Sequence, residues 1–179
     1  MTTKQAAPAR SPVLGNTVRC AITGYTGVAN QQVELLGGTV QFSVQPKVGA
    51  EKDSAAYPDG MNIDAHMLDF VDEGVAARVT PVTETVDVAL GEKVEDRVTG
   101  FVGIATAKHT FANGCVYFSV TPQMSKDDKE KGTAPNTSFF AHGRLKKVNS
   151  GVTAAIVIPP VASNGKVPGG PATKMRRAS

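Results

Sequence analysis

The sequence predicts an all-β protein made of two tandem small SH3-like β-barrel units with extended N- and C-terminal arms. Three observations lead to this prediction. The chain repeats itself internally, the repeated segments alternate apolar and polar residues, and tight-turn signals separate those segments. A repeat of about 70 residues with about five short strands has the content of a small barrel.

The internal repeat is the dominant feature of the chain. Leu14–Pro46 aligns with Leu90–Pro122 at a constant offset of 76 residues and without a gap. After one inserted residue the alignment resumes at an offset of 77 and includes the pair Gly74/Gly151. Glycines and apolar positions keep their phase throughout. A period of this length in only two copies indicates two small domains rather than a solenoid.

These limits divide the chain into five segments. The predicted organisation is an N-terminal arm (1–13), a first β-barrel repeat (14–82), a linker (83–89), a second β-barrel repeat (90–161) and a basic, Pro/Gly-rich C-terminal arm (162–179). The linker is rich in Thr and Val, so we expect it to be ordered, with an extended strand as one form.

The clearest strands lie at residues 40–44 and 116–120, where apolar and polar residues alternate. Gly-Gly and Asn-Gly dipeptides come before them and predict tight hairpin turns in which both turn residues have positive φ. The predicted turn residues are Gly37, Gly38, Asn113 and Gly114.

Other elements are predicted more coarsely. Gly24, Gly27, Gly100 and Gly103 indicate a bulge or a sharply bent strand. A polar surface loop follows each hairpin. Short apolar segments at 61–71, 137–148, 74–82 and 151–161 are predicted to supply the remaining strands, and no convincing amphipathic helix is expected.

Charge is distributed unevenly along the chain. The formal net charge is +3, but every acidic residue lies between Glu34 and Glu130, which leaves a mildly acidic body with basic arms. We take the basic residues of the arms as candidate assembly contacts: Lys4, Arg10, Lys174, Arg176 and Arg177. No secretory signal and no apolar run near the roughly 20 residues of a membrane span are seen, so no membrane association is expected.

Residues that carry chemistry do not form a recognisable constellation. We find no phosphate-binding loop and no metal-ligand spacing, and therefore predict no enzyme, no cofactor, and no catalytic, cofactor-binding or metal residues. His66, His109 and His142 are interpreted as surface or interface residues. Two cysteines, Cys20 and Cys115, fit a reduced soluble protein, although an intramolecular or inter-subunit disulfide stays open.

A specific motif runs through the second repeat. It reads LG-x2-V-x-D-x2-TGF-x-GIAT, followed by NGC-x-Y-x2-V-x-P. Its residues are Leu90, Gly91, Val94, Asp96, Thr99, Gly100, Phe101, Gly103, Ile104, Ala105, Asn113, Gly114, Cys115, Tyr117, Val120 and Pro122. With these residues the second repeat resembles a small protein family of tailed-bacteriophage genomes. The first repeat matches more loosely, with Cys20 in place of the aspartate.

The resemblance implies a phage context and supplies no catalytic residues. From that context we expect a virion structural protein, a capsid cement or decoration protein that stabilises the head by binding the major capsid protein. The expected location is the virion, assembled in the host cytoplasm. Expected partners are the major capsid protein or other virion proteins, further copies of the chain on the particle, and weakly a nucleic acid through the basic C-terminal arm.

Two alternatives stay open at this point. One is a neck or tail attachment protein of the virion, which the sequence does not separate from a cement protein. The other belongs to a different class, a tandem β-barrel module that binds a nucleic acid or a host protein.

Overall fold

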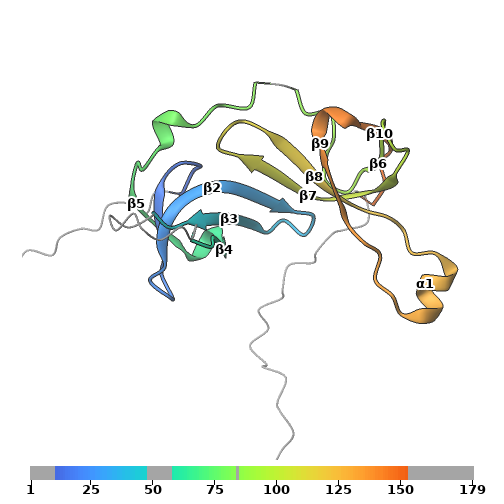
Figure 1. Ribbon diagram of the computed structural model, residues 1–179, viewed down its shortest axis with the longest axis horizontal. Coiled ribbons are helices and arrows are strands. Elements are labelled where there is room, and N and C mark those ends of the chain that lie inside the picture. The colour runs from blue at the N-terminus through green and yellow to red at the C-terminus, as the bar shows by residue number, and fades with distance from the viewer. Residues whose placement is uncertain (1–10, 48–57, 84, 153–179) are drawn as a thin grey trace, which may run out of the picture.

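Ten strands form one antiparallel sheet in this chain. The structure is a computed structural model that describes residues 11–47, 58–83 and 85–152. Figure 1 shows two lobes joined at the middle of the sheet, with the connecting chain passing over the top. The predicted all-β class is confirmed.

The strands fall into two sets of five. We call the first set the first unit: β1 (Thr17–Cys20), β2 (Thr26–Leu35), β3 (Val40–Gln45), β4 (Met61–Asp64) and β5 (Leu68–Asp72). The second unit contains β6 (Lys93–Asp96), β7 (Val102–Phe111), β8 (Val116–Thr121), β9 (Ser138–Ala141) and β10 (Leu145–Asn149). The first three strands of each unit differ by 76 residue numbers and the last two by 77, as in the sequence repeat.

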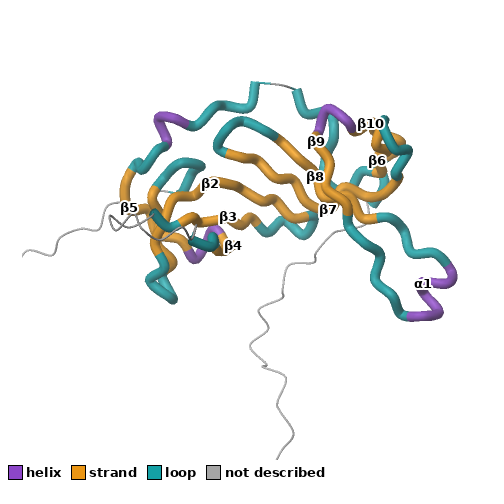
Figure 2. The backbone as a smooth tube through the Cα atoms, viewed as in Figure 1, coloured by secondary structure: helices purple, strands orange, loops and turns teal. Residues whose placement is uncertain are grey.

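Short helices interrupt the strands. Three are 3-10 helices, namely η1 (Ala65–Met67), η2 (Ala76–Arg78) and η3 (His142–Arg144), and one is the α-helix α1 (Lys126–Lys131). Helices η1 and η3 occupy the same place in the two units, immediately before the last strand. Figure 2 shows α1 on a long loop that projects away from the sheet.

Strand order is the same in both units. All pairings are antiparallel, and within the first unit the order is β5-β1-β2-β3-β4. The second unit repeats it as β10-β6-β7-β8-β9. Strands that follow one another in sequence are neighbours in each unit, except that the 3-10 helix η1 or η3 carries the last strand across to pair with the first.

Each unit has its own apolar core. The alternation in β3 and β8 places the apolar residues on one face, so that Phe42 and Val44 are buried in the first core and Phe118 and Val120 in the second. The rest of the first core is Val18, Cys20, Ala29, Ile63 and Leu68, and the rest of the second is Val88, Val94, Ala105, Val116, Phe140 and Leu145.

The two hairpins end in three-residue turns rather than the two-residue turns expected. Gly38 (φ 84°) and Gly114 (φ 83°) have positive φ, and no residue other than glycine does among the described residues. The Phe111 N–H donates to Cys115 O at 3.0 Å and the Gly114 N–H donates to Phe111 O at 2.9 Å. This is a type I turn closed by a glycine bulge, so the prediction of positive φ at Gly37 and Asn113 was wrong.

The predicted bulge is also displaced from the glycines. The register of β2 and β3 shifts at Asn30, and that of β7 and β8 shifts at Thr106. Gly27 and Gly103 serve another purpose, because a Cβ on either would lie within 2.6 Å of a backbone carbonyl oxygen on the neighbouring strand. They allow the bent strand to cross its partner closely.

One further glycine lies at the end of each unit. Gly74 (φ 52°) and Gly151 (φ 57°) follow the last strand, and a Cβ there would lie 2.4 Å from Gly15 O and 2.1 Å from Gly91 O. The next residue in each case donates its N–H to the same oxygen, at 2.7 Å from Val75 and 2.8 Å from Val152. The end of each unit is thus hydrogen-bonded to the turn before its first strand.

Strands β2 and β7 join the two units. Gln31–Leu35 pairs with Ala107–Phe111 in antiparallel register, and we call this pairing the seam. The repeat offset carries Gln31 onto Ala107 and Leu35 onto Phe111. The register is therefore unchanged when the two strands are exchanged. The seam therefore has a pseudo-twofold axis at the pair Val33/His109.

Two further hydrogen bonds obey the same symmetry. The Leu36 N–H donates to Thr106 O at 2.9 Å, and the Ala112 N–H donates to Asn30 O at 3.0 Å. Beside them, Lys108 Nζ lies 3.2 Å from Glu34 Oε1. The bulged residues Asn30 and Thr106 thus receive the first bond beyond each end of the seam.

The connection between the units differs from prediction. Residues 74–82 were expected to include a strand, but they contain η2 and no strand. The described residues of the linker, 83 and 85–89, are not in a strand either, and Val88 packs in the second core. Helix α1 lies in the polar loop and begins at a capping box, in which Ser125 accepts from the Asp128 N–H.

Candidate functional site

Outward-facing residues of β7, β8 and β9 form the candidate site. Cross-strand pairing places His109 beside Tyr117 and Phe139 beside Ser119, on the face opposite the second core. Phe111 lies two residues beyond His109 and therefore on the same face. We call His109, Phe111, Tyr117 and Phe139 the aromatic face.

The rings of the aromatic face contact one another. Tyr117 and Phe139 are stacked, with centroids 4.9 Å apart and planes 5° apart. Phe111 meets Tyr117 edge-on at 5.8 Å, and His109 meets Phe139 edge-on at 4.8 Å. Phe139 nevertheless remains 49% exposed. Such a large apolar ring, supported from below and open above, is suited to contact with a partner.

The first unit has no such face. The residues equivalent to His109, Phe111, Tyr117 and Phe139 are Val33, Leu35, Gln41 and Asn62. In place of stacked rings the first unit has a polar contact, in which Gln41 Nε2 donates to Asp64 Oδ1 at 2.8 Å. The aromatic face therefore belongs to one half of a nearly symmetric scaffold.

His109 lies between the two units and connects the aromatic face to the seam. Gln31 Nε2 lies 2.9 Å from His109 Nδ1, and His109 Nε2 lies 2.8 Å from Ser119 Oγ. With the amide nitrogen of Gln31 donating to Nδ1, the ring proton is on Nε2 and is donated to the serine hydroxyl. A nucleophilic serine needs the reverse, a ring nitrogen that accepts its proton. This arrangement orients His109 and does not activate Ser119.

Burial lowers the pKa of His109 below its ordinary value of 6.5. The folded state therefore binds a proton less readily than the unfolded state, and the stability that His109 contributes is present above pH 6.5 and is lost as pH falls below it.

We expect the free energy of unfolding to decrease between about pH 7 and pH 5 more in the native chain than in His109→Gln. Urea unfolding at a series of pH values measures this difference. Parallel pH profiles for the two proteins would contradict it.

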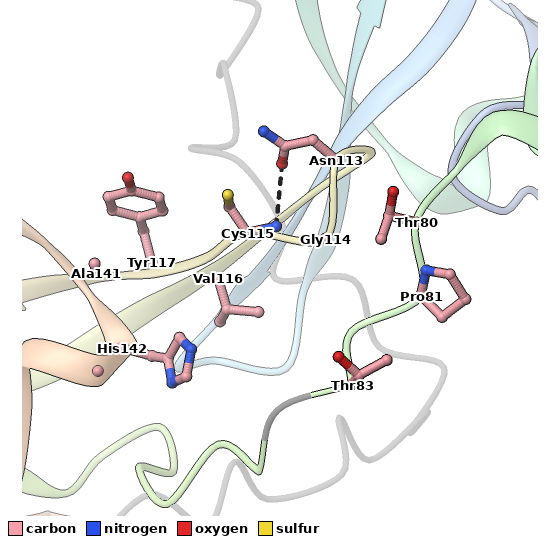
Figure 3. Close-up of a pocket in the computed structure, with 11 residues that line it drawn as sticks. Thr80, Pro81, Thr83, Asn113, Gly114, Cys115, Val116, Tyr117, Ala141 and His142 are labelled. Atoms are coloured by element: carbon pink, nitrogen blue, oxygen red, sulfur yellow. Dashed lines mark hydrogen bonds between the residues drawn. The ribbon is translucent and has the colours of Figure 1, made fainter.

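A pocket of about 420 Å³ adjoins the aromatic face and shares Tyr117 with it. Figure 3 shows Thr80, Pro81 and Thr83 on one side and the hairpin residues Asn113 to Val116 on the other. The Cys115 N–H donates to Asn113 Oδ1 at 3.0 Å, which fixes the hairpin edge of the pocket. Cys115 is exposed here as a free thiol, whereas Cys20 is buried in the first core as a free thiol.

Buried charge in the second unit lies away from the aromatic face. Asp96 is fully buried, and Arg144 donates to it from Nε at 2.9 Å and from Nη2 at 2.7 Å. These bonds, opposed by burial and helped by donation from Thr99, hold the pKa of the Asp96 carboxyl far below its usual range. The carboxylate is thus fully paired and has a structural role.

The structure places the other predicted site residues as follows. Lys4, Arg10, Lys174, Arg176 and Arg177 lie outside the described residues. Gly37, Gly38, Asn113 and Gly114 form the two hairpin tips, and only the second tip lines the pocket. His66 and His142 lie in η1 and η3. No group of three metal-ligating side chains occurs in the parts of the chain that the structure describes.

The aromatic face was missed in the sequence, although one signal for it was present. Tyr117 is recognisable as an outward residue of its strand, but pairing it with Phe139 requires the register of β8 and β9.

No helix among the described residues is long and apolar enough to cross a membrane. No family model, curated protein or solved structure matches the chain.

Proposed function

We propose that the chain is a non-enzymatic structural protein that binds a large protein assembly through the aromatic face, and that this assembly is a phage head. In this proposal it is a capsid cement or decoration protein whose partner is the major capsid protein. The observation that carries the proposal is the cluster of exposed, mutually supported rings on the second unit.

The composition of the face supports a protein partner. The four residues of the aromatic face carry no formal charge when the histidine is neutral, and neither do the residues beside them on the same side of the sheet, Ala107, Ser119 and Ala141. Protein interfaces concentrate aromatic anchors at their centres and exclude charge there. A nucleic acid, by contrast, requires cations beside stacking rings to neutralise its phosphates.

The finer fold is part of the same proposal. Each unit has the strand order β5-β1-β2-β3-β4 or its equivalent, and a 3-10 helix before the last strand. This order and the closure at Gly74 and Gly151 support two tandem SH3-like barrels. The phage context is supported by the motif from Leu90 to Pro122, and the basic arms would add contacts on neighbouring shell subunits.

The structure offers a matched test of the aromatic face. Tyr117→Ala/Phe139→Ala should raise the dissociation constant for shell particles roughly 30-fold or more, because two central anchors are removed. The control is Gln41→Ala/Asn62→Ala, which alters the equivalent positions of the first unit and should leave binding unchanged. Sedimentation with purified particles measures both.

Two outcomes would contradict the proposal. Equal binding by both double variants would show that the aromatic face is not the contact surface. Absence of the chain from purified particles of the encoding phage would exclude a virion role altogether. Binding to single-stranded nucleic acid that weakens steeply with salt would instead favour the module of the other class.

A further inference from the structure

The two terminal strands of the sheet are equivalent under the pseudo-twofold axis, yet they carry opposite charge. The main strand path runs β10-β6-β7-β2-β1-β5, so β10 and β5 are its two ends. Figure 1 shows these strands at opposite ends of the long axis of the molecule. Among the described residues, β5 pairs only with β1 and β10 pairs only with β6.

Both terminal strands expose an apolar side chain at the same position. Val71 in β5 is 48% exposed, and its equivalent Val148 in β10 is 47% exposed. Each valine is the extra residue of a bulge, because the register with the neighbouring strand skips it. A bulge hinders long backbone pairing between the edge of a sheet and another chain. We therefore expect any contact at these ends to be made by side chains.

Charge distinguishes the two ends. Strand β5 contains Asp69 and Asp72 and no cation, whereas β10 contains Lys146 and Lys147 and no anion. All four residues are exposed. We call the exposed residues Asp69, Val71 and Asp72 the acidic end, and the exposed residues Lys146 and Val148 the basic end.

The reversal of charge extends to the neighbouring strands. Arg19 in β1 lies opposite Asp69, and the equivalent pair in the second unit is Glu95 opposite Lys146. Lys146 Nζ lies 3.1 Å from Glu95 Oε1, and Lys147 pairs with Glu92. Each outer charge therefore has an opposite charge one strand further in, which supports it within its own unit.

This charge pattern favours one arrangement of two copies. An acidic end placed against a basic end brings Asp69 of one copy near Lys146 of the other and removes two exposed valines from water. Two acidic ends or two basic ends would instead repel each other. The favourable contact is heterologous, because it uses different surfaces of the two copies.

We propose that the acidic end of one copy binds the basic end of a second copy, so that chains associate head to tail along their long axis. Each added copy leaves one acidic and one basic end free, so the association does not stop at a dimer. The contact is small and exposed to solvent, and therefore weak and sensitive to salt. This inference does not depend on the proposed capsid function, since it needs no other protein.

Sedimentation equilibrium of the purified full chain over a concentration series tests the inference. In about 20 mM salt we expect the average mass to increase continuously up to about 1 mM protein, as in open-ended growth. In about 500 mM salt the dissociation constant should be higher by roughly tenfold or more, because the end charges are screened.

The chain supplies matched variants, because each end can be given the residues of the other. The first variant has two basic ends and the second has two acidic ends: Arg19→Glu/Asp69→Lys/Asp72→Asn and Glu95→Arg/Lys146→Asp/Asn149→Asp. Both keep opposite charges across the strand pair, and their melting temperatures check the fold. Each variant alone should associate roughly tenfold more weakly than the native chain. An equimolar mixture should recover association to within about threefold of native, because unlike ends meet again.

A single change tests the basic end without altering an ion pair. Val148→Asp places an acid beside Lys146 on an exposed residue, and should raise the dissociation constant by roughly tenfold. The double variant Tyr117→Ala/Phe139→Ala is the control, and should associate like the native chain because the aromatic face is not part of either end.

Four outcomes would overturn the inference. The first is a native chain that stays monomeric in low salt up to about 1 mM, and the second is association that stops at a dimer. The third is native-like association by either charge-exchanged variant alone or by Val148→Asp. The fourth is loss of association in Tyr117→Ala/Phe139→Ala, which would show that copies meet through the aromatic face.

Discussion

Replacing Arg144 alone by methionine is expected to lower the melting temperature more than replacing both members of its ion pair. Arg144→Met leaves the Asp96 carboxylate buried without its bidentate partner, which is strongly destabilising. The first unit carries Cys20 and Met67 at the equivalent positions, and Cys20 packs in its core while Met67 packs against it. The double variant Asp96→Cys/Arg144→Met copies that apolar solution and should recover most of the loss.

Thermal unfolding of the two single variants and the double variant forms a complete cycle. A double variant that loses as much as the two single variants combined would show that the pair is not coupled. Acid unfolding supplies a second readout. Because the folded pKa of Asp96 is depressed from 3.8, its contribution is present above that pH and is lost as pH falls below it. The double variant should therefore have a flatter acid limb than the native chain.

Phe118→Ala is expected to reduce the free energy of unfolding by about 3–5 kcal/mol. Phe118 is fully buried at the centre of the second core, where its removal leaves a cavity. Phe42→Ala is the equivalent change in the first core and should have a similar effect. A loss of this size is a large share of the stability of a small domain.

The same two variants test whether the units unfold together. Strand β2 is central to the first unit and also pairs with β7, so unfolding either unit removes the partner of the other across the seam. We expect each variant to shift one common transition in calorimetry. Two transitions, of which each variant shifts only one, would show that the units are thermodynamically independent.

The sequence predicted the elements better than their connections. Alternation in β3 and β8 follows directly from the pleat, and the repeat offset placed every strand of the second unit on its counterpart. The turns were mispredicted because Asn-Gly fits two hairpin types. The three-residue turn follows from the bond between Phe111 and Cys115, which requires the register of the two strands.

The site was harder to predict because it depends on pairing. His109, Tyr117 and Phe139 come from three strands, and only the registers of β7, β8 and β9 bring their rings together. The seam could not be predicted for the same reason, because nothing in the local sequence of β2 shows that its free edge pairs with β7. Helix α1 was accessible in principle, because Ser125, Asp128 and Gly132 mark its two ends.

The pseudo-twofold seam has a consequence for which surfaces the molecule exposes. Two identical chains paired in this way would display every surface twice, the two copies being related by a half-turn about the axis through the seam. Covalent fusion of the two copies removes that obligation, because each half can then acquire different side chains on the same backbone. Tyr117 and Phe139 carry rings, whereas the equivalent Gln41 and Asn62 carry amides. The aromatic face therefore occurs once, which makes the chain asymmetric. A chain with one such face offers a single copy of that surface, whereas a symmetric dimer would offer two.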